Sequence, residues 1–163
     1  MSTKDFLKKY RAKRDFQKTK EPKGKTKGLS EKPIFVIQKH DARNLHYDFR
    51  IEIDGALKSW AVPKGPSQYS ADKRLAVPTE DHPLEYAKFS GKIPEGEYGA
   101  GTVEIWDQGV FQNLRDVDLK ESLKQGQIEI SLSGKRLNGA YVLRRFQGKP
   151  KALWLLIKMK RKE

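Results

Sequence analysis

The sequence predicts a mainly β protein, folded as an antiparallel barrel or sandwich with short flanking helices. Many short runs alternate apolar and polar residues, and turns rich in Gly, Pro and Asn separate these runs. Only two stretches, both short, have a helical pattern. A chain of 163 residues suits one domain and is long enough to bury a core.

The expected strands follow one another closely along the chain. Asp54-Gly55 is a strong two-residue hairpin signal, and folding about it sets Phe49 opposite Trp60 and Arg50 opposite Ser59.

A capping box at Asp118 and a stop at Gly126 predict a helix over 118–125. The glycine-rich stretch 91–101 lacks the order of a P-loop and is interpreted as turns. Strands are expected at 34–38, 45–53, 56–62, 76–79, 101–106, 110–114, 128–132, 140–146 and 153–159.

The first 30 residues differ in character from the rest. Residues 4–16 predict a short amphipathic helix with Phe6, Leu7 and Tyr10 on one side. Residues 18–33 form a polar linker rich in Lys, Gly and Pro. We therefore expect a basic, flexible leader over 1–30 and a barrel domain over 31–163.

Charge and composition narrow the function. The net charge of +13 lies mostly at the ends, because residues 1–30 hold 11 Lys and Arg against 3 Asp and Glu, while 31–157 are nearly neutral. Basic chain ends favour a polyanion such as nucleic acid, although a solubilising tail gives the same pattern. The absence of cysteine excludes disulfides and thiol catalysis. With no long apolar run and no signal peptide, a cytoplasmic protein is expected.

One short run carries the most chemistry. On a strand, His46, Asp48 and Arg50 project from the same face, while Tyr47 and its apolar neighbours point into the core. With His82 this face predicts a triad of two imidazoles and one carboxylate, which suits Mn, Fe, Zn, Ni or Co. The alternative is that the histidines are hydrogen-bonded structural residues and that Arg50 only forms a salt bridge to Asp48.

Other polar residues lie close to this run in the sequence. His40 is a candidate general acid or base, or an ordinary loop histidine. Tyr86 is a candidate phosphate ligand, or a half-buried aromatic residue, and Glu80 is a candidate for orienting a metal ligand. Lys64 and Arg74 could add positive charge, although such residues are more often solvated.

Three segments resemble the 3′-phosphoesterase domain of bacterial DNA ligase D. They are YRAKRDFQKTKEP in the leader, FVIQKHDARNLHYDFRIEIDGALKSWAVPKGP, and TEDHPLEYAKFSGKIPEGEYGAGTVEIWDQG. The resemblance covers most of the chain and implies a compact antiparallel β-barrel with flanking helical pieces. It implies a manganese-dependent enzyme that removes a terminal ribonucleoside from a 3′ end and then removes the 3′-phosphate. Since 163 residues cannot hold ligase and polymerase domains as well, we expect this module to stand alone.

The resemblance also implies roles for individual residues. Mn²⁺, or another divalent transition metal, would be held by His46, Asp48 and His82. His40 and Arg50 would contact phosphate, and Tyr86 matches an essential tyrosine. The supporting positions are Lys64, Arg74 and Glu80, and the leader residues linked to the diesterase step are Arg14, Asp15 and Glu21.

The predicted partners are DNA or DNA/RNA 3′ ends, together with a separate end-joining ligase, polymerase or Ku-type protein. We expect a monomer with no membrane contact, in the cytoplasm and associated with the nucleoid. Two alternatives remain open on the residues alone. One is a non-haem iron oxygenase, because that class uses the same triad. The other is a non-catalytic nucleic-acid-binding barrel.

Overall fold

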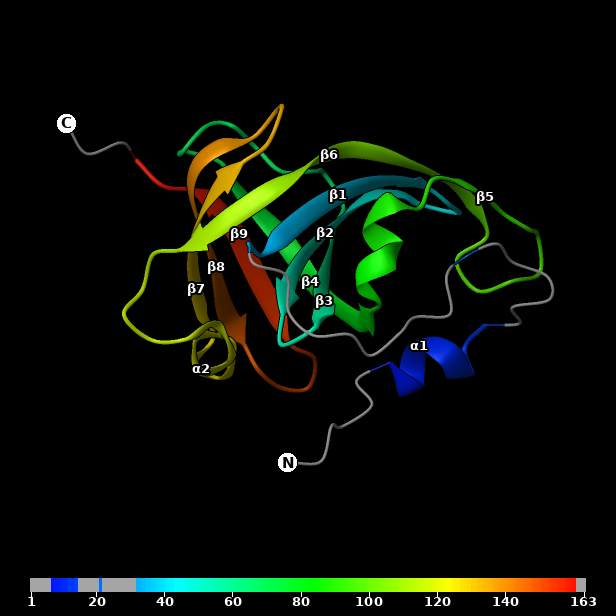
Figure 1. The fold of residues 1–163 in the computed structure, drawn as a ribbon, viewed down its shortest axis with the longest axis horizontal. Helices are drawn as coiled ribbons and strands as arrows, with labels where there is room; N and C mark the ends of the chain where they lie inside the picture. Colours follow the sequence, from blue (N-terminus) through cyan, green and yellow to red (C-terminus); the bar gives the residue numbers. More distant parts are fainter. Residues whose placement is uncertain (1–6, 15–20, 22–31, 161–163) are drawn as a thin grey trace.

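Eight antiparallel strands close into a barrel in the computed structural model, which describes residues 7–14, 21 and 32–160 (Figure 1). The ring runs β1-β2-β3-β4-β9-β8-β7-β6 and closes through the pairing of β1 with β6, while β5 pairs with β6 outside the ring. The predicted antiparallel β-barrel is confirmed. Its strands are β1 (Ile34–Asp41), β2 (Leu45–Ile53), β3 (Ala56–Val62), β4 (Lys73–His82), β5 (Gly91–Ile93), β6 (Gly101–Asn113), β7 (Gln127–Ser133), β8 (Asn138–Gln147) and β9 (Leu153–Lys158). The helical pieces are α1 (Lys8–Ala12), η1 (Leu84–Lys88) and α2 (Leu119–Gln125).

The inside of the barrel is an apolar core. Phe49 lies opposite Trp60 across β2 and β3, as the hairpin signal predicts, and the Trp60 ring meets Trp154 edge-on with centroids 5.4 Å apart. Phe49 and Ile51 are fully buried in this core. The alternate residues of β2 must therefore face outward from the barrel.

A second, smaller core covers the outside of β1, β2 and β3. It contains Val36 and Leu57 from the strands, Tyr86 and Ala87 from η1, and Tyr10 from α1. Figure 1 shows η1 and α1 beside this wall. Polar residues that face outward here are consequently buried, although they lie outside the barrel.

Three strands differ most from their predicted limits, and β7, β8 and β9 differ by one or two residues. β1 continues to Asp41, and β4 begins at Lys73 and ends at His82, because pairing with neighbouring strands extends both beyond their apolar runs. The two strands predicted within 101–114 are a single β6 with an irregularity near Trp106. At that point the buried Asp107 carboxylate accepts hydrogen bonds from the backbone N–H groups of Lys135 and Leu137. β5 and η1 were not predicted, since each is too short to show a period.

A bulge in β4 decides which of its side chains face the second core. Leu57 pairs with His82, and Ser59 pairs with Thr79. One residue lies between the paired positions on β3, whereas two lie between them on β4. Regular alternation would put Thr79 and His82 on opposite faces. The bulge brings both to the outer face.

The helices follow their sequence signals. Asp118 accepts a hydrogen bond from the Glu121 backbone N–H at 2.8 Å, and Gly126 ends α2 in the left-handed conformation at φ 78°. This confirms the predicted cap and stop. In α1, Leu7 and Tyr10 are buried, as the amphipathic pattern predicts. The helix is shorter than the predicted 4–16, since α1 ends at Ala12 and Lys13 and Arg14 are not helical. Residues 1–6 and most of the linker lie outside the described residues.

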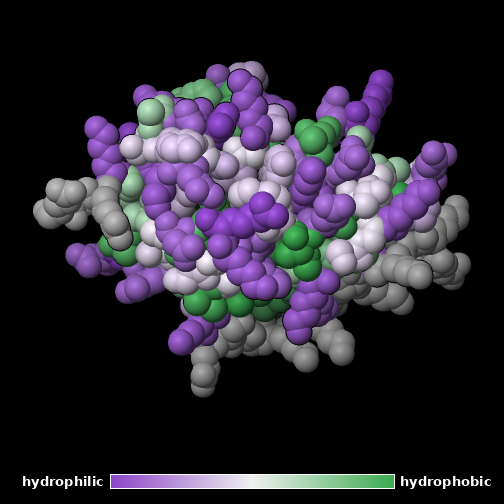
Figure 2. Space-filling model, turned by 90° about the horizontal axis from the view of Figure 1, so that it is seen from above, coloured by the Kyte–Doolittle hydropathy of each residue, from purple (hydrophilic) through white to green (hydrophobic). Residues whose placement is uncertain are grey.

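Polar side chains cover most of the face seen in Figure 2, and apolar ones form separate small groups. Within the described part of the chain, no helix has the length and apolar character that a membrane span requires.

Substitution of Gly101 by alanine should destabilise the protein where β1 and β6 meet. Gly101 has φ 140°, and an added Cβ would lie against the Asp41 carbonyl oxygen and 2.8 Å from Ala42 Cα. We expect the free energy of unfolding to fall by about 2–3 kcal/mol in urea denaturation.

The matched control is Gly148→Ala, since a Cβ at Gly148 meets nothing within 4 Å and the backbone is not left-handed there. Its free energy of unfolding should stay within about 0.5 kcal/mol of the wild type. Equal effects of the two substitutions would contradict the close approach at Gly101.

Candidate functional site

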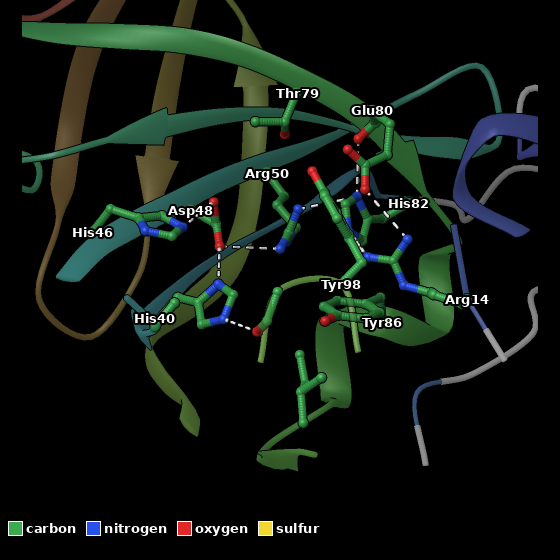
Figure 3. A pocket seen from close by; sticks show the side chains of 13 residues that line it. Arg14, His40, His46, Asp48, Arg50, Thr79, Glu80, His82, Tyr86 and Tyr98 are labelled. Atoms are coloured by element: carbon green, nitrogen blue, oxygen red, sulfur yellow. Dashed lines mark hydrogen bonds and ion pairs between the residues drawn. The ribbon is translucent and has the colours of Figure 1, made fainter. Parts of the chain in front are cut away.

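An open pocket of about 200 Å³ lies on the outer face of β1, β2 and β4 (Figure 3). Its wall comes from those strands, and its rim comes from η1, the segment around β5 and Arg14, two residues beyond the end of α1. Charged side chains from the strands converge here with the Tyr86 ring of the second core. The lining residues are Arg14, His40, Ala42, His46, Asp48, Arg50, Thr79, Glu80, His82, Tyr86, Ile93, Tyr98 and Gly99.

His40, His46 and Asp48 form a cluster that can hold a metal ion. One ligand atom from each residue lies within 4.8 Å of the other two. The cluster depends on the β1–β2 register, which pairs His40 with His46 directly. Asp48 follows two residues along β2 on the same face, so its carboxylate reaches both imidazoles.

Each imidazole directs one ring nitrogen at this carboxylate and the other at a backbone carbonyl. His40 Nε2–H donates to the Gly99 carbonyl at 2.7 Å, and His46 Nδ1–H donates to the Asn44 carbonyl at 2.9 Å. The other nitrogens, His40 Nδ1 and His46 Nε2, lie 3.4 and 3.2 Å from the oxygens of Asp48. Metal-bound histidines are typically held through the second nitrogen in this way. When both imidazoles are neutral, their lone pairs and those of the Asp48 carboxylate point toward one another. A proton or a cation between them would remove this repulsion.

The charge of Asp48 is fixed by its neighbours. Burial of this carboxyl group opposes ionisation, but the Arg50 guanidinium and hydrogen bonds from His40 and His46 outweigh burial and hold the pKa of Asp48 well below its usual range. The hydrogen bond to Asp48 raises the pKa of His46 above its ordinary value. In the absence of a metal, His46 therefore keeps its proton to a higher pH than a free imidazole does.

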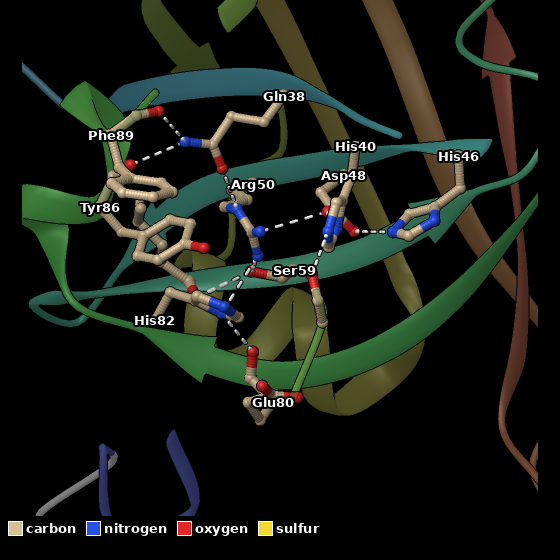
Figure 4. Close-up of polar contacts among 12 residues, drawn as sticks. Gln38, His40, His46, Asp48, Arg50, Ser59, Glu80, His82, Tyr86 and Phe89 are labelled. Atoms are coloured by element: carbon tan, nitrogen blue, oxygen red, sulfur yellow. Dashed lines mark hydrogen bonds and ion pairs between the residues drawn. The ribbon is translucent and has the colours of Figure 1, made fainter. Parts of the chain in front are cut away.

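Arg50 is locked in place beside this cluster (Figure 4). Its Nε donates to Gln38 Oε1 at 2.7 Å, its Nη1 donates to Ser59 Oγ at 3.0 Å, and its Nη2 lies 3.3 Å from Asp48 Oδ2. Gln38 is itself held by the carbonyl groups of Tyr86 and Phe89. The guanidinium is therefore oriented before any ligand enters the pocket, a geometry suited to phosphate oxygens.

His82 lies between two guanidinium groups and outside the cluster. Arg14 Nη2 is 3.3 Å from His82 Nε2, and Arg50 Nη1 is 3.1 Å from His82 Nδ1. Nδ1 is also 2.9 Å from the Glu80 carbonyl, so an Nδ1–H that donates there leaves Nε2 to accept from Arg14. Burial, together with the positive charges of Arg50 and Arg14, holds the pKa of His82 well below its ordinary value.

Two carboxylates balance the guanidinium of Arg14. Glu21 Oε2 accepts from Arg14 Nε at 2.9 Å and from the Tyr86 hydroxyl at 2.7 Å, and Glu80 Oε1 lies 3.3 Å from Arg14 Nη1. Burial raises the pKa of Tyr86 far above its ordinary value despite the nearby Arg50, and Glu21 raises it further. Tyr86 is therefore a neutral hydrogen-bond donor.

The structure brings most of the predicted site residues together. The pocket is lined by Arg14, His40, His46, Asp48, Arg50, Glu80, His82 and Tyr86, and Glu21 contacts two of them. Lys64 and Arg74 do not line it, and Arg74 instead faces Asp72 at 3.6 Å. Asp15 lies outside the described residues.

Sequence reasoning missed several contributors. It predicted His40 as a phosphate-contacting residue beyond the end of the first strand, whereas β1 continues through His40 and pairs it with His46. The alternation of Val36, Gln38 and His40 was the available signal. Gln38 and Ser59, which orient Arg50, gave no signal of their own. Thr79 has a buried hydroxyl without a hydrogen-bond partner among the described residues.

The fold and the pocket define a β-barrel domain that combines a carboxylate–imidazole cluster with fixed guanidinium groups. Residues 38–145 match the model of the DNA ligase D 3′-phosphoesterase domain. The chain therefore belongs to this family, which implies a phosphoester hydrolase. This agrees with the resemblance in the sequence.

Three relatives illustrate the similarity. The chain is 49% identical over 158 residues to the multifunctional non-homologous end joining protein LigD of Pseudomonas aeruginosa, covering 94% of this chain and 18% of that protein. It is 48% identical over 145 residues to the non-homologous end joining DNA repair protein LigD of Mycobacterium tuberculosis, covering 88% and 19%. With LigD of Mycolicibacterium smegmatis the identity is 45% over 164 residues, covering 96% and 21%. The chain thus spans about a fifth of the length of these relatives.

His46 and His82, two of the three pocket histidines, should have pKa values shifted in opposite directions in the metal-free protein. His82 should stay neutral through the range near pH 6.5 where a free imidazole protonates, whereas His46 should remain protonated above it. Nitrogen-15 chemical shifts of the imidazoles measure both. Because the unfolded chain binds a proton at His82 that the folded chain does not, this residue lowers the stability of the fold as the pH falls below about 6.5. An ordinary titration of His82 would show that the two guanidinium groups do not control it.

Proposed function

We propose that the protein is a manganese-dependent phosphoesterase that processes 3′ ends of DNA or DNA/RNA during end repair. It removes a terminal ribonucleoside by phosphodiester hydrolysis and then removes the 3′-phosphate to leave a 3′-hydroxyl. The observation that carries the proposal is one pocket with a cation-binding cluster at one side and fixed guanidinium groups at the other. A divalent cation and a phosphate complement these two sides. A separate ligase, polymerase or Ku-type protein would act on the same ends.

The donor set of the cluster supports a transition metal. Two imidazole nitrogens and one carboxylate suit Mn, Fe, Zn, Ni or Co, whereas Mg and Ca prefer oxygen ligands alone. His40 and His46 each have the second nitrogen held by a backbone carbonyl, and Asp48 stays ionised. When bound here, such an ion would polarise a phosphoryl oxygen and lower the pKa of a bound water.

We assign the third ligand position to His40. The sequence alone favoured His46, Asp48 and His82, and the two sets share His46 and Asp48. Two features support His40: Nδ1 lies 3.4 Å from the Asp48 carboxylate, and Nε2 is already held by Gly99. The ring of His82 faces Arg14 and Arg50 instead, and so belongs with the phosphate-binding groups in this proposal.

The chain's own residues then have separate tasks. Arg50 binds two phosphate oxygens and stabilises the negative charge that grows on them. Arg14 binds the phosphate from the other side of His82, and Tyr86, which is protonated, supplies a hydrogen bond. His82 remains neutral, so that it does not repel either guanidinium. In hydrolysis a water oxygen forms the new bond to phosphorus, the ester bond breaks, and the proton lost by water is balanced by one that the leaving oxygen gains.

An oligonucleotide that ends in one ribonucleotide tests the activity directly. Incubated with Mn²⁺, it should give a 3′-phosphate product first and a 3′-hydroxyl product later, resolved by gel electrophoresis. Asp48→Asn should lose at least about 100-fold in both steps, because it removes the only charged member of the cluster. The matched control is Asp72→Asn, whose carboxylate lies away from the pocket and should leave both rates unchanged. Turnover that requires oxygen and a co-substrate would point to an oxygenase, and binding without turnover would point to a non-catalytic barrel.

Paired substitutions of His40 and His82 by glutamine distinguish the two ligand sets. His40→Gln should weaken Mn²⁺ binding by at least about 100-fold, measured by calorimetry and by the electron paramagnetic resonance signal of the ion. His82→Gln should leave the Mn²⁺ affinity within about threefold and lower the rate of phosphate release. The opposite result would assign the metal to His46, Asp48 and His82.

A further inference from the structure

We propose that Tyr98 is a stacking surface for the base of the terminal nucleoside that the enzyme removes. This inference rests on the proposed function and deepens it, because it names the part of the substrate that the rim of the pocket recognises. Nucleobases stack on exposed aromatic rings whatever their sequence, which suits an enzyme that must accept any terminal base.

Tyr98 is the aromatic side chain that the pocket offers to a ligand. It is 49% exposed, whereas Tyr86, which also lines the pocket, is 2% exposed and buried under η1. Figure 3 shows Tyr98 across the pocket from Asp48, beside Arg14 and Glu80. Among the residues that the structure describes, two other aromatic side chains are exposed, Tyr69 and Phe146, and neither lines this pocket.

The backbone holds Tyr98 at a fixed place relative to the cluster. The next residue, Gly99, accepts a hydrogen bond from His40 Nε2 at 2.7 Å. Gly99 is left-handed, with φ 77°, and the Ala100 N–H closes a turn on the Glu97 carbonyl at 3.1 Å. A base that stacks on Tyr98 would therefore lie next to Gly99, whose carbonyl holds the proposed metal ligand His40.

Positive charge gathers around the ring. Lys13 Nζ lies 4.5 Å from the ring centroid and Arg14 Cζ lies 5.5 Å from it. Lys13 also pairs with Glu80 at 3.3 Å, which ties the rim to β4. An aromatic ring flanked by cations matches the two features of a nucleotide, a flat base and a phosphate.

The geometry favours the terminal nucleoside over the continuing strand. Behind Arg14 lies the fully buried Tyr10, whose ring centroid is 4.0 Å from Arg14 Cζ and 5.0 and 5.9 Å from the ring centroids of His82 and Tyr86. A single nucleoside beyond the phosphate can end at this wall, whereas a continuing strand needs an open path. The upstream strand must then leave past the other side of the pocket.

A cycle of four rate measurements tests the stacking. One substrate ends in a ribonucleoside and the other ends in the same ribose without its base, and each is given to the wild type and to Tyr98→Ala. We expect loss of the base to lower kcat/KM about tenfold in the wild type, and less than about twofold in Tyr98→Ala. Tyr98→Phe should behave as the wild type, since it keeps the ring. Tyr98→Leu should behave as Tyr98→Ala, which separates ring stacking from apolar bulk.

Tyr69→Ala is the matched control, because Tyr69 is an exposed tyrosine that does not line the pocket, and it should keep the wild-type response. A 3′-phosphate substrate, which has no nucleoside beyond the phosphate, should react equally well with Tyr98→Ala and the wild type. An unchanged base effect in Tyr98→Ala, or an equal loss on the 3′-phosphate substrate, would overturn the stacking proposal and leave the proposed function intact. Absence of turnover by the wild type on every substrate would refute the proposed function itself.

Discussion

The ion pair between Asp48 and Arg50 is the contact around which the pocket is organised. Both side chains are almost fully buried, at 4% and 3% exposure, between the barrel wall and η1. A buried charge without a partner costs several kcal/mol, so neither residue is tolerable there without the other. Gln38 and Ser59 complete the hydrogen bonds of the guanidinium and allow it no other orientation. The two imidazoles of the cluster then converge on the carboxylate that remains charged.

The result is a pocket with two chemically different sides. On one side, Asp48 and the acceptor nitrogens of two histidines concentrate negative potential, which a cation relieves. On the other side, Arg14 and Arg50 concentrate positive potential, which an anion relieves. His82 separates the two guanidinium groups as a neutral ring, and its lowered pKa follows from that position. These two sides match the cation and the phosphate of the proposed function.

The N-terminal residues contribute to the same balance. Arg14 brings a further positive charge over the pocket, and Glu21 and Glu80 neutralise part of it. Glu21 also accepts a hydrogen bond from Tyr86, so one buried carboxylate joins the leader to η1. The bulge in β4 is needed for this arrangement because it turns His82 toward Arg14 while Thr79 keeps the same face. The described part of the leader is therefore a wall of the site, on whose rim Lys13 meets Tyr98.

The sequence by itself determined the β-barrel class, the β2–β3 register and the shared face of His46, Asp48 and Arg50. These features follow from alternation along one strand and from a two-residue turn, both of which are local. Tertiary structure alone decided that His40 lies opposite His46, that His82 lies between two arginines, and that Arg14 and Glu21 reach η1. Those contacts depend on the length of β1, on a bulge in β4 and on the packing of Tyr10 in a second core. Such contacts join segments that are distant in the sequence, or they depend on strand pairing that overrides local propensity. They therefore leave no periodic signal in the sequence.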